Sequence, residues 1–286
     1  MMTFTERLHQ RMSVWWGVPG GWRNPWTWHR PVHRVVDRHR LRDRTWPLER
    51  WRCCDLWQRA LHNKWNAREF AAMHAVPVPE LYWHGRRIGD LPLRQLPEHF
   101  VLRPVWGSRG IGTHVITRGR DLLQERSYTD AELRAALRRE HGAIARVPIL
   151  AEEFMTTEEG DYRQGVEYKF YAFGDRVAAI LQVEHRGRTI LQRHYRADWT
   201  PFDDPMSTMR DLADPRPRPS RLDDLLDIAR RLGGSYGTFV RVDLYLTAKG
   251  CYFGEFSSVP YEGHGFTPWA DEYFGRCWDE TCPDRT

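Results

Sequence analysis

Apolar and polar residues alternate in several short runs, which is the period of a β-strand. Residues 100–103 and 114–117 are short strand-like runs on either side of a glycine-rich turn at 107–112, so they predict a hairpin. Residues 149–155 predict a further strand, which leads into a polar loop at 156–165.

Two more hairpins are predicted in the second half of the chain. Residues 167–172 and 176–184 alternate on either side of a Gly-Asp pair, which is typical of tight turns. Residues 239–246 and 251–256 alternate on either side of a four-residue turn. Both patterns predict antiparallel strand pairs.

Helical periodicity occurs over residues 61–75, 129–141 and 222–232. Thr129 is placed to cap the second helix, with Glu132 at the reciprocal position of a capping box. Gly233 and Gly234 predict the end of the third helix. Residues 201–221 are rich in proline and charge and predict a surface loop. Helices mixed with antiparallel hairpins predict the α+β class.

The composition is that of a globular protein, with 286 residues, 41% hydrophobic and 28% charged. No apolar run approaches a membrane span, and the start lacks the apolar core of a secretory signal, so we expect a cytoplasmic protein without a membrane span. The five cysteines fit neither a disulfide framework nor a zinc site, and we expect reduced thiols.

Residues 1–60 are rich in tryptophan and arginine, with Trp15, Trp16, Trp22, Trp26, Trp28, Trp46, Trp51 and Trp57. Together with the net charge of +5, this leaves open a surface on which nucleic-acid bases stack. Because the basic residues are spread along the chain and no nucleic-acid motif is present, packing against the main body is favoured.

The last hairpin carries the most chemistry. Arg241 and Asp243 are two residues apart on one strand, so their side chains share a face, and the same holds for Glu255 and Ser257 on the other. Carboxylate oxygens without histidine or thiolate ligands suit Mg²⁺. A cross-strand ion pair of Arg241 with Glu255 or Asp243 explains the hairpin equally well.

Two upstream segments are weak signals when taken singly. Glycines at 107, 110 and 112 allow backbone N–H groups to approach phosphate oxygens, although the segment lacks the Walker and dinucleotide-binding patterns. The strand at 149–155 ends in Phe154 and Met155, which could offer apolar walls to an adenine ring.

Taken together and in this order, the segments resemble the ATP-grasp superfamily and, more closely, the TupA-like ATP-grasp family, named for teichuronopeptide synthesis. The resemblance extends from about Asn24 to about Gly275. It is carried by Asn24–Trp28, Asn63–Phe70, Phe100–Gly110, Ile149–Met155, Glu167–Phe170, Tyr195–Trp199 and Phe239–Ser257.

The resemblance implies a set of site residues. Those implied to bind ATP are Lys64, Arg103, Gly107, Ser108, Gly110, Gly112, Glu152, Phe154, Met155, Glu167 and Lys169. Those implied to hold metal are Asp243, Glu255 and Ser257. Arg241 and Lys64 would stabilise the transferring phosphoryl group or the acyl intermediate. Arg193, His194 and His264 are candidates for substrate binding. Two positions depart from the superfamily: Arg103 replaces the usual lysine, and Ser257 the frequent asparagine.

The fold implied is two α+β subdomains that clamp ATP, with a short Trp-rich helical region before them. We expect the boundaries 1–75, 76–155 and 156–286. The activity implied is a carboxylate–amine ligase that uses ATP and one or two Mg²⁺ ions, which Mn²⁺ could replace, and small acid and amine substrates. A small-molecule kinase and a polyanion-binding protein are the alternatives, nucleic acid is not an expected partner, and a monomer and a dimer are both left open.

Overall fold

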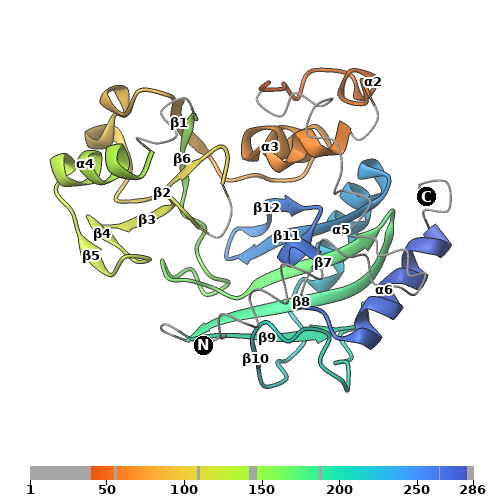
Figure 1. The fold of residues 1–286 in the computed structure, drawn as a ribbon. Helices are drawn as coiled ribbons and strands as arrows, with labels where there is room; N and C mark the ends of the chain where they lie inside the picture. The colour runs from red at the N-terminus through yellow and green to blue at the C-terminus, as the bar shows by residue number, and fades with distance from the viewer. Residues whose placement is uncertain are drawn as a thin grey trace, which may run out of the picture.

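The computed structural model describes residues 40–54, 57–107, 110–141, 147–186, 189–263 and 265–281. Two six-stranded sheets organise these residues, as Figure 1 shows. The first sheet lies within residues 81–153 and the second within residues 167–257. The chain passes from the first sheet to the second through residues 154–166, close to the expected boundary at 155.

The first sheet has the order β1-β6-β2-β3-β4-β5 and pairs antiparallel throughout. Its strands are β1 (Leu81–Gly85), β2 (His99–Pro104), β3 (His114–Thr117), β4 (Arg120–Asp121), β5 (Arg126–Ser127) and β6 (Ile149–Glu153). Helix α4 (Asp130–His141) covers it, and its Leu133 and Leu137 pack against the strand residues Phe100 and Leu102.

The predicted capping box at the start of α4 is present. The backbone N–H of Thr129 donates to the Glu132 carboxylate at 2.8 Å, and the backbone N–H of Glu132 donates to the Thr129 hydroxyl at 3.3 Å. This reciprocal pair satisfies backbone donors that a helix start leaves without intrahelical partners.

The second sheet has the order β10-β9-β8-β7-β11-β12. Its strands are β7 (Glu167–Phe173), β8 (Arg176–Arg186), β9 (Thr189–Tyr195), β10 (Asp211–Leu212), β11 (Phe239–Thr247) and β12 (Gly250–Ser257). Helix α5 (Leu222–Tyr236) packs on one face, and α6 (Pro268–Thr281) covers part of the other. The 3-10 turns are η1 (Trp57–His62), η2 (Ile88–Asp90), η3 (Leu93–Gln95) and η5 (Pro260–Gly263).

The predicted end of the third helix is wrong. Helix α5 continues through both glycines to Tyr236, and Gly237, at φ 78°, ends it in the left-handed conformation. A Cβ on Gly233 would lie 2.3 Å from the carbonyl oxygen of Gly174 in the β7–β8 turn. The glycine therefore permits close packing of helix on turn rather than ending the helix.

The described part of the N-terminal region packs on the same face as α5. Helix α2 (Leu48–Trp51), η1 and α3 (Lys64–Met73) contribute Trp51, Trp57 and Phe70 to one apolar core with α5 and the second sheet. The rings of Trp51 and Trp57 lie 5.5 and 5.6 Å from that of Phe70. These tryptophans are packing residues, while the Asn24–Trp28 motif lies outside the described residues.

Among the longer elements, β1, β9 and α6 were not predicted from sequence, and neither were the two-residue strands β4, β5 and β10. The expected surface loop at 201–221 contains the short strand β10, and Met206 and Ala213 within it are buried. Within the described part of the chain, Cys53, Cys54, Cys251 and Cys277 form no disulfide bond. Among the helices described, none is long and apolar enough to cross a membrane.

Candidate functional site

Strand pairing places a row of residues side by side across the second sheet. His194 on β9 pairs with Leu181 on β8, which pairs with Lys169 on β7. Lys169 pairs with Asp243 on β11, and Asp243 pairs with Glu255 on β12. Directly paired residues point to the same face, so Lys169 and Asp243, 74 positions apart in the chain, meet in one row.

The carboxylate of Asp243 lies at the centre of this row and is held by two cations. The guanidinium of Arg241 donates to both its oxygens, from Nε at 2.7 Å and from Nη2 at 2.8 Å. The ammonium of Lys169 donates to Oδ2 at 2.7 Å. Asp243 is only 6% exposed, so these contacts provide the compensation that a buried carboxylate requires.

Lys169 also bridges to a second carboxylate. Its Nζ lies 2.5 Å from Oε2 of Glu167, whose other oxygen lies 3.2 Å from Nε2 of His185. Burial alone would raise the pKa of Glu167, but Lys169 and His185 outweigh burial and hold that pKa far below its usual value. Burial alone would lower the pKa of Lys169, but Asp243 and Glu167 raise it above its usual value.

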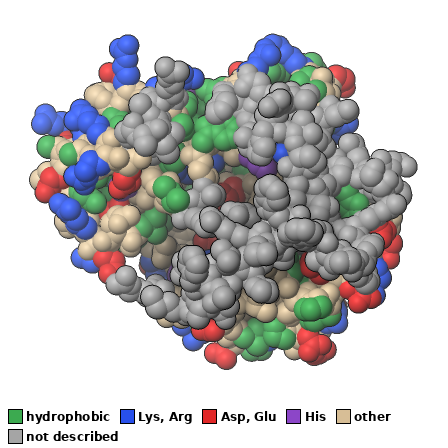
Figure 2. Space-filling model, in the orientation of Figure 1, with side chains coloured by type: hydrophobic (Ala, Val, Ile, Leu, Met, Phe, Trp, Pro, Cys, Tyr) green, Lys and Arg blue, Asp and Glu red, His purple; other side chains and the backbone are tan. Residues whose placement is uncertain are grey.

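Glu255 is the more accessible carboxylate of the row. Its side chain is 43% exposed, and its Oε1 lies 3.8 Å from Nη2 of Arg241. Ser257 pairs with Arg241 on the neighbouring strand and lies on the same face. Figure 2 shows acidic side chains within a hollow near the centre of this view.

The donor chemistry of this cluster fits Mg²⁺. Three carboxylates, those of Glu167, Asp243 and Glu255, face the two cations Lys169 and Arg241, which leaves an excess of negative charge. The described residues contain no group of three or more His, Cys, Asp and Glu side chains arranged to hold a metal ion. A Mg²⁺ site with two protein carboxylates takes its other ligands from waters and phosphates. The ion pair predicted as the alternative is also present, between Arg241 and Asp243.

A second group of residues faces this row from α3 and β2. Lys64 begins α3, and its Nζ donates to the carbonyl of Gly107 at 2.8 Å. Burial lowers the pKa of Lys64 and Arg103 lowers it further, while Glu255 opposes the shift. Glu255 also acts electrostatically on Arg103. The charges of Lys64 on α3 and Arg103 on β2 are therefore close enough to Glu255 to act on it electrostatically.

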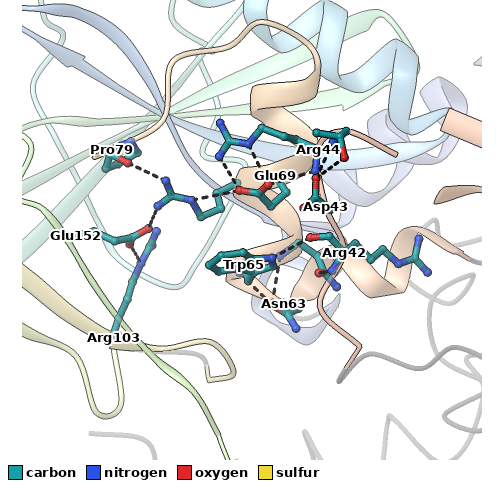
Figure 3. A network of polar contacts seen from close by, with 12 residues as sticks. Arg42, Asp43, Arg44, Asn63, Trp65, Glu69, Pro79, Arg103 and Glu152 are labelled. Atoms are coloured by element: carbon teal, nitrogen blue, oxygen red, sulfur yellow. Dashed lines mark hydrogen bonds and ion pairs between the residues drawn. The ribbon is translucent and has the colours of Figure 1, made fainter. Parts of the chain in front are cut away.

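A buried chain of ion pairs positions Arg103, as Figure 3 shows. Its Nε donates to Oε2 of Glu152 at 2.5 Å, and Arg68 donates to Oε1 of the same carboxylate at 2.5 Å. Arg68 also approaches Glu69, which accepts two hydrogen bonds from the guanidinium of Arg44. Glu152 is 2% exposed, and its side chain is occupied by the two arginines.

Arg68 and Glu69 belong to the motif Asn63–Phe70, but the sequence did not indicate a role for either residue. The feature of the sequence that could have indicated their role is an arginine next to a glutamate, one helical turn after Lys64. The roles proposed for Arg68 and Glu69 are therefore to position residues of the site rather than to contact a ligand.

The glycine-rich turn after β2 depends on unusual backbone conformations. Gly107, Gly110 and Gly112 have φ values of 142°, 70° and 70°, which other residues rarely adopt. Ser108 lies outside the described residues. The carbonyl of Gly107 accepts the hydrogen bond from Lys64, so the turn lies beside the candidate site.

The end of β6 supplies the apolar residues expected near adenine. The ring of Phe154 is buried and lies 5.7 Å from that of Tyr162, which stacks on His99 at 3.6 Å. Met155 is half-buried beside it. The residues expected to border a nucleotide thus lie on the segment that joins the two sheets.

The two substrate candidates within the described residues, Arg193 and His194, do not lie on one face. Arg193 and His194 are neighbours on a strand, so their side chains point to opposite faces. His194 lies on the face of Asp243, whereas Arg193 lies on the other and donates to the carbonyl of Ala213 at 2.5 Å. Burial lowers the pKa of His194 to about 3, so its ring is neutral. His264 lies outside the described residues.

A cavity of about 260 Å³ opens elsewhere on the second sheet. Tyr168 and Leu246 line it, and both alternate with residues of the Asp243 row, so they point to the opposite face. Glu184 in its wall already accepts a hydrogen bond from Arg216 at 2.8 Å. Most of the cavity therefore lies on the face opposite Asp243, and His185, which also lines it, connects it to Glu167.

Comparison with protein families decides the assignment. The model of the family described as TupA-like ATP-grasp matches residues 50–279, most of the chain. The chain belongs to the TupA-like ATP-grasp family. The match contains the Asp243 row, Lys64 and Arg103, and it confirms the family and fold predicted from sequence.

Solved structures agree with the ATP-grasp fold. D-alanine–D-alanine ligase from Bacillus anthracis, solved with ATP, is 13% identical with a TM-score of 0.51, and the match covers 80% of this chain and 68% of that one. D-alanyl-alanine synthetase A from Vibrio cholerae O1 biovar eltor is 12% identical with a TM-score of 0.50, covering 78% and 66%. At these identities the likeness concerns the fold alone.

The ATP-grasp ligase PsnB, solved with a minimal precursor, is 15% identical with a TM-score of 0.44, and the match covers 76% of this chain. The chain spans 60% of the length of PsnB. No curated protein matches the chain.

Proposed function

We propose that this TupA-like ATP-grasp protein is an ATP-dependent carboxylate–amine ligase that forms an amide or peptide bond through an acyl phosphate. The observation that carries the proposal is the convergence of carboxylates and cations from two sheets. Asp243 and Glu255 come from the second sheet, while Lys64 and Arg103 come from α3 and the first. Family membership and the fold shared with D-alanine ligases support the same chemistry.

ATP would lie between the two sheets. Lys64 and Arg103 would bind its phosphates, and the backbone of the turn at 107–112 would cover the β- and γ-phosphates. Phe154 and Met155 would border adenine, together with the backbone of Glu152. Glu167 and Lys169 share the face of Asp243 and would approach the ribose and the phosphates.

Asp243 and Glu255 would hold Mg²⁺, and Ser257 would contribute to a second ion. When bound, Mg²⁺ would neutralise phosphate charge and orient the γ-phosphoryl group. Arg241 lies beside both carboxylates. Its guanidinium would stabilise the negative charge on the transferring phosphoryl group or on the acyl phosphate.

The proposed ligation would proceed in two steps. An oxygen of the substrate carboxylate attacks the γ-phosphorus of ATP, the bond from phosphorus to the ADP oxygen breaks, and an acyl phosphate forms. A neutral amine then attacks the carbonyl carbon, the bond to phosphate breaks, and the amine nitrogen loses a proton. Because acyl phosphates hydrolyse readily, closure of the glycine-rich turn would exclude water.

His194 is the substrate candidate that the structure brings onto the same face as Asp243. Its buried, neutral ring offers a hydrogen bond without charge, so it would contact a polar but uncharged part of a substrate. Arg193 points to the opposite face of the sheet, so its side chain cannot reach the site around Asp243 in this strand arrangement. We propose a cytoplasmic location, where ATP and small acids and amines are available.

The test is a screen of nucleotide release with Mg²⁺ against pairs of amino acids and acidic sugars. The ligase proposal expects ADP and phosphate that depend on both an acid and an amine. Release of AMP would exclude an acyl phosphate. A phosphorylated product that needs no amine would show the kinase alternative instead.

The same screen separates the polyanion-binding alternative, which needs no ATP. Figure 2 shows lysine and arginine side chains over the first sheet with acidic side chains between them, rather than gathered into one patch. Binding of a polyanion that falls steeply with salt, without nucleotide release in any mixture, would support that alternative.

A further inference from the structure

One buried hydroxyl beside the Asp243 row has no partner. Tyr171 lies on β7 two residues after Lys169 and is fully buried. Within the described part of the chain, its phenol oxygen makes no hydrogen bond. An unpaired buried hydroxyl costs free energy that a phenylalanine at the same position would not. We therefore expect a state of the protein in which this hydroxyl makes a hydrogen bond.

The ring of Tyr171 is firmly packed and cannot turn away to solvent. It stacks on Phe274 at 5.1 Å and contacts Phe239 and Phe266 at 6.3 and 6.2 Å. These contacts would be the same for a phenylalanine. A partner must accordingly come to the hydroxyl, because the hydroxyl cannot move to a partner.

Arg241 is a polar group placed to reach the hydroxyl of Tyr171. It pairs directly with Tyr171 across β7 and β11, so the two side chains lie on one face as immediate neighbours. Burial raises the pKa of Tyr171, and the nearby charge of Arg241 opposes that shift. At present the guanidinium donates to Asp243 instead.

Arg241 and a divalent cation would compete for the Asp243 carboxylate. Its Oδ2 already accepts hydrogen bonds from Nη2 of Arg241 and Nζ of Lys169, and two cations on one buried carboxylate repel each other. A guanidinium released from Asp243 would be buried and would need a new acceptor. The phenol oxygen of Tyr171 is unused and adjacent.

We propose that Tyr171 is a positioning residue: when Asp243 binds a divalent cation, the guanidinium of Arg241 leaves that carboxylate and donates to the phenol oxygen of Tyr171. This rests on the metal site of the proposed function. In the cation-free protein the guanidinium of Arg241 occupies the place of the cation. In the cation-bound protein Tyr171 holds this guanidinium beside the phosphoryl group.

The experiment measures Mn²⁺ binding by calorimetry to the full chain, without nucleotide, for wild type and Tyr171→Phe. Because the tyrosine hydroxyl is used only in the cation-bound state, Tyr171→Phe binds Mn²⁺ about tenfold more weakly. The thermal midpoint of its cation-free form is unchanged or higher. The matched control is Tyr273→Phe, whose hydroxyl donates to the backbone carbonyl of Ala178 rather than lying beside Arg241, and it retains wild-type Mn²⁺ affinity.

A double-mutant cycle identifies the partner. Arg241→Met removes the competing cation and binds Mn²⁺ more tightly than wild type. In that background Tyr171→Phe has no further effect on the affinity.

Three results overturn the inference. Equal Mn²⁺ affinities of wild type and Tyr171→Phe would show that the hydroxyl plays no part. An undiminished effect of Tyr171→Phe in the Arg241→Met background would assign the hydroxyl to another partner, such as His194, whose ring lies 5.9 Å away. Absence of Mn²⁺ binding by wild type would remove the metal site itself, and with it that part of the proposed function.

Discussion

Lys169 and Asp243 lie directly opposite each other on adjacent strands, and their side chains are joined by a hydrogen bond of 2.7 Å between Nζ and Oδ2. They are 74 positions apart in the chain. The pair connects the carboxylate proposed to hold metal to Glu167 and so sets the charge of the whole row. Its removal should therefore affect both stability and ligand binding.

Lys169→Met should destabilise the protein by about 1.5–3 kcal/mol, because it removes one of the two cations that hold Asp243 and leaves Glu167 with His185 alone. Urea unfolding measures the change. Lys249→Met is the matched control: its ion pair with Glu153 is made by a lysine that is 61% exposed, so the loss should stay below about 1 kcal/mol. Equal losses in the two variants would contradict the central place of Lys169.

Glu255→Gln should separate function from stability. Its side chain is 43% exposed and has one distant ion pair, so its free energy of unfolding should change by less than about 1 kcal/mol. Mn²⁺ binding and ADP release should be lost, because an amide is a poorer ligand than a carboxylate. Calorimetry and a coupled ADP assay measure the two effects, and retained Mn²⁺ binding would remove Glu255 from the metal site.

Gly233→Ala and Gly234→Ala should act in opposite directions. A Cβ on Gly233 would lie 2.3 Å from the carbonyl oxygen of Gly174, so the substitution should destabilise by about 1–3 kcal/mol. A Cβ on Gly234 would lie at an ordinary 3.5 Å from Asp175, so alanine should stabilise the helix by about 0.5–1 kcal/mol. Thermal unfolding of both variants tests this, and the same sign for both would contradict it.

The stability of the first sheet should decrease as the pH rises through the pKa of His114. The ring of this buried histidine contacts Asp121 at 2.7 Å and Glu140 at 3.0 Å. Burial alone would lower the pKa of His114, but the two carboxylates outweigh burial and raise it. A raised folded pKa gives stability that is full below the unfolded value of about 6.5 and is lost as the pH passes the folded value.

The measurement is urea unfolding of wild type and His114→Gln between pH 6 and pH 10. The difference in unfolding free energy between the two proteins should be largest at pH 6 and should shrink toward pH 10, as His114 loses its proton. Taking the difference removes the contribution of titrating groups that both proteins share. A constant difference, or one that grows with pH, would mean that His114 is neutral in the folded protein.

Much of the site follows from local pattern. Strand-like runs on either side of turn residues predict the three hairpins, and the period of two residues places Arg241 with Asp243 and Glu255 with Ser257 on common faces. The capping box at Thr129 is also a local signal, since its partners are three residues apart. The motifs in their order indicate the family, because each motif keeps its residue types and its place in the sequence.

What only the tertiary structure decided is which strands pair and what fills the space between elements. Lys169 meets Asp243 because β7 pairs with β11, and no local period encodes a partner 74 positions away. Gly233 lies inside α5 because the β7–β8 turn approaches it, so a signal for a helix end gave way to packing. Arg193 and His194 separate because β9 is a strand within the sheet. Local periodicity thus determined the faces of the elements, whereas long-range pairing and close packing determined their neighbours.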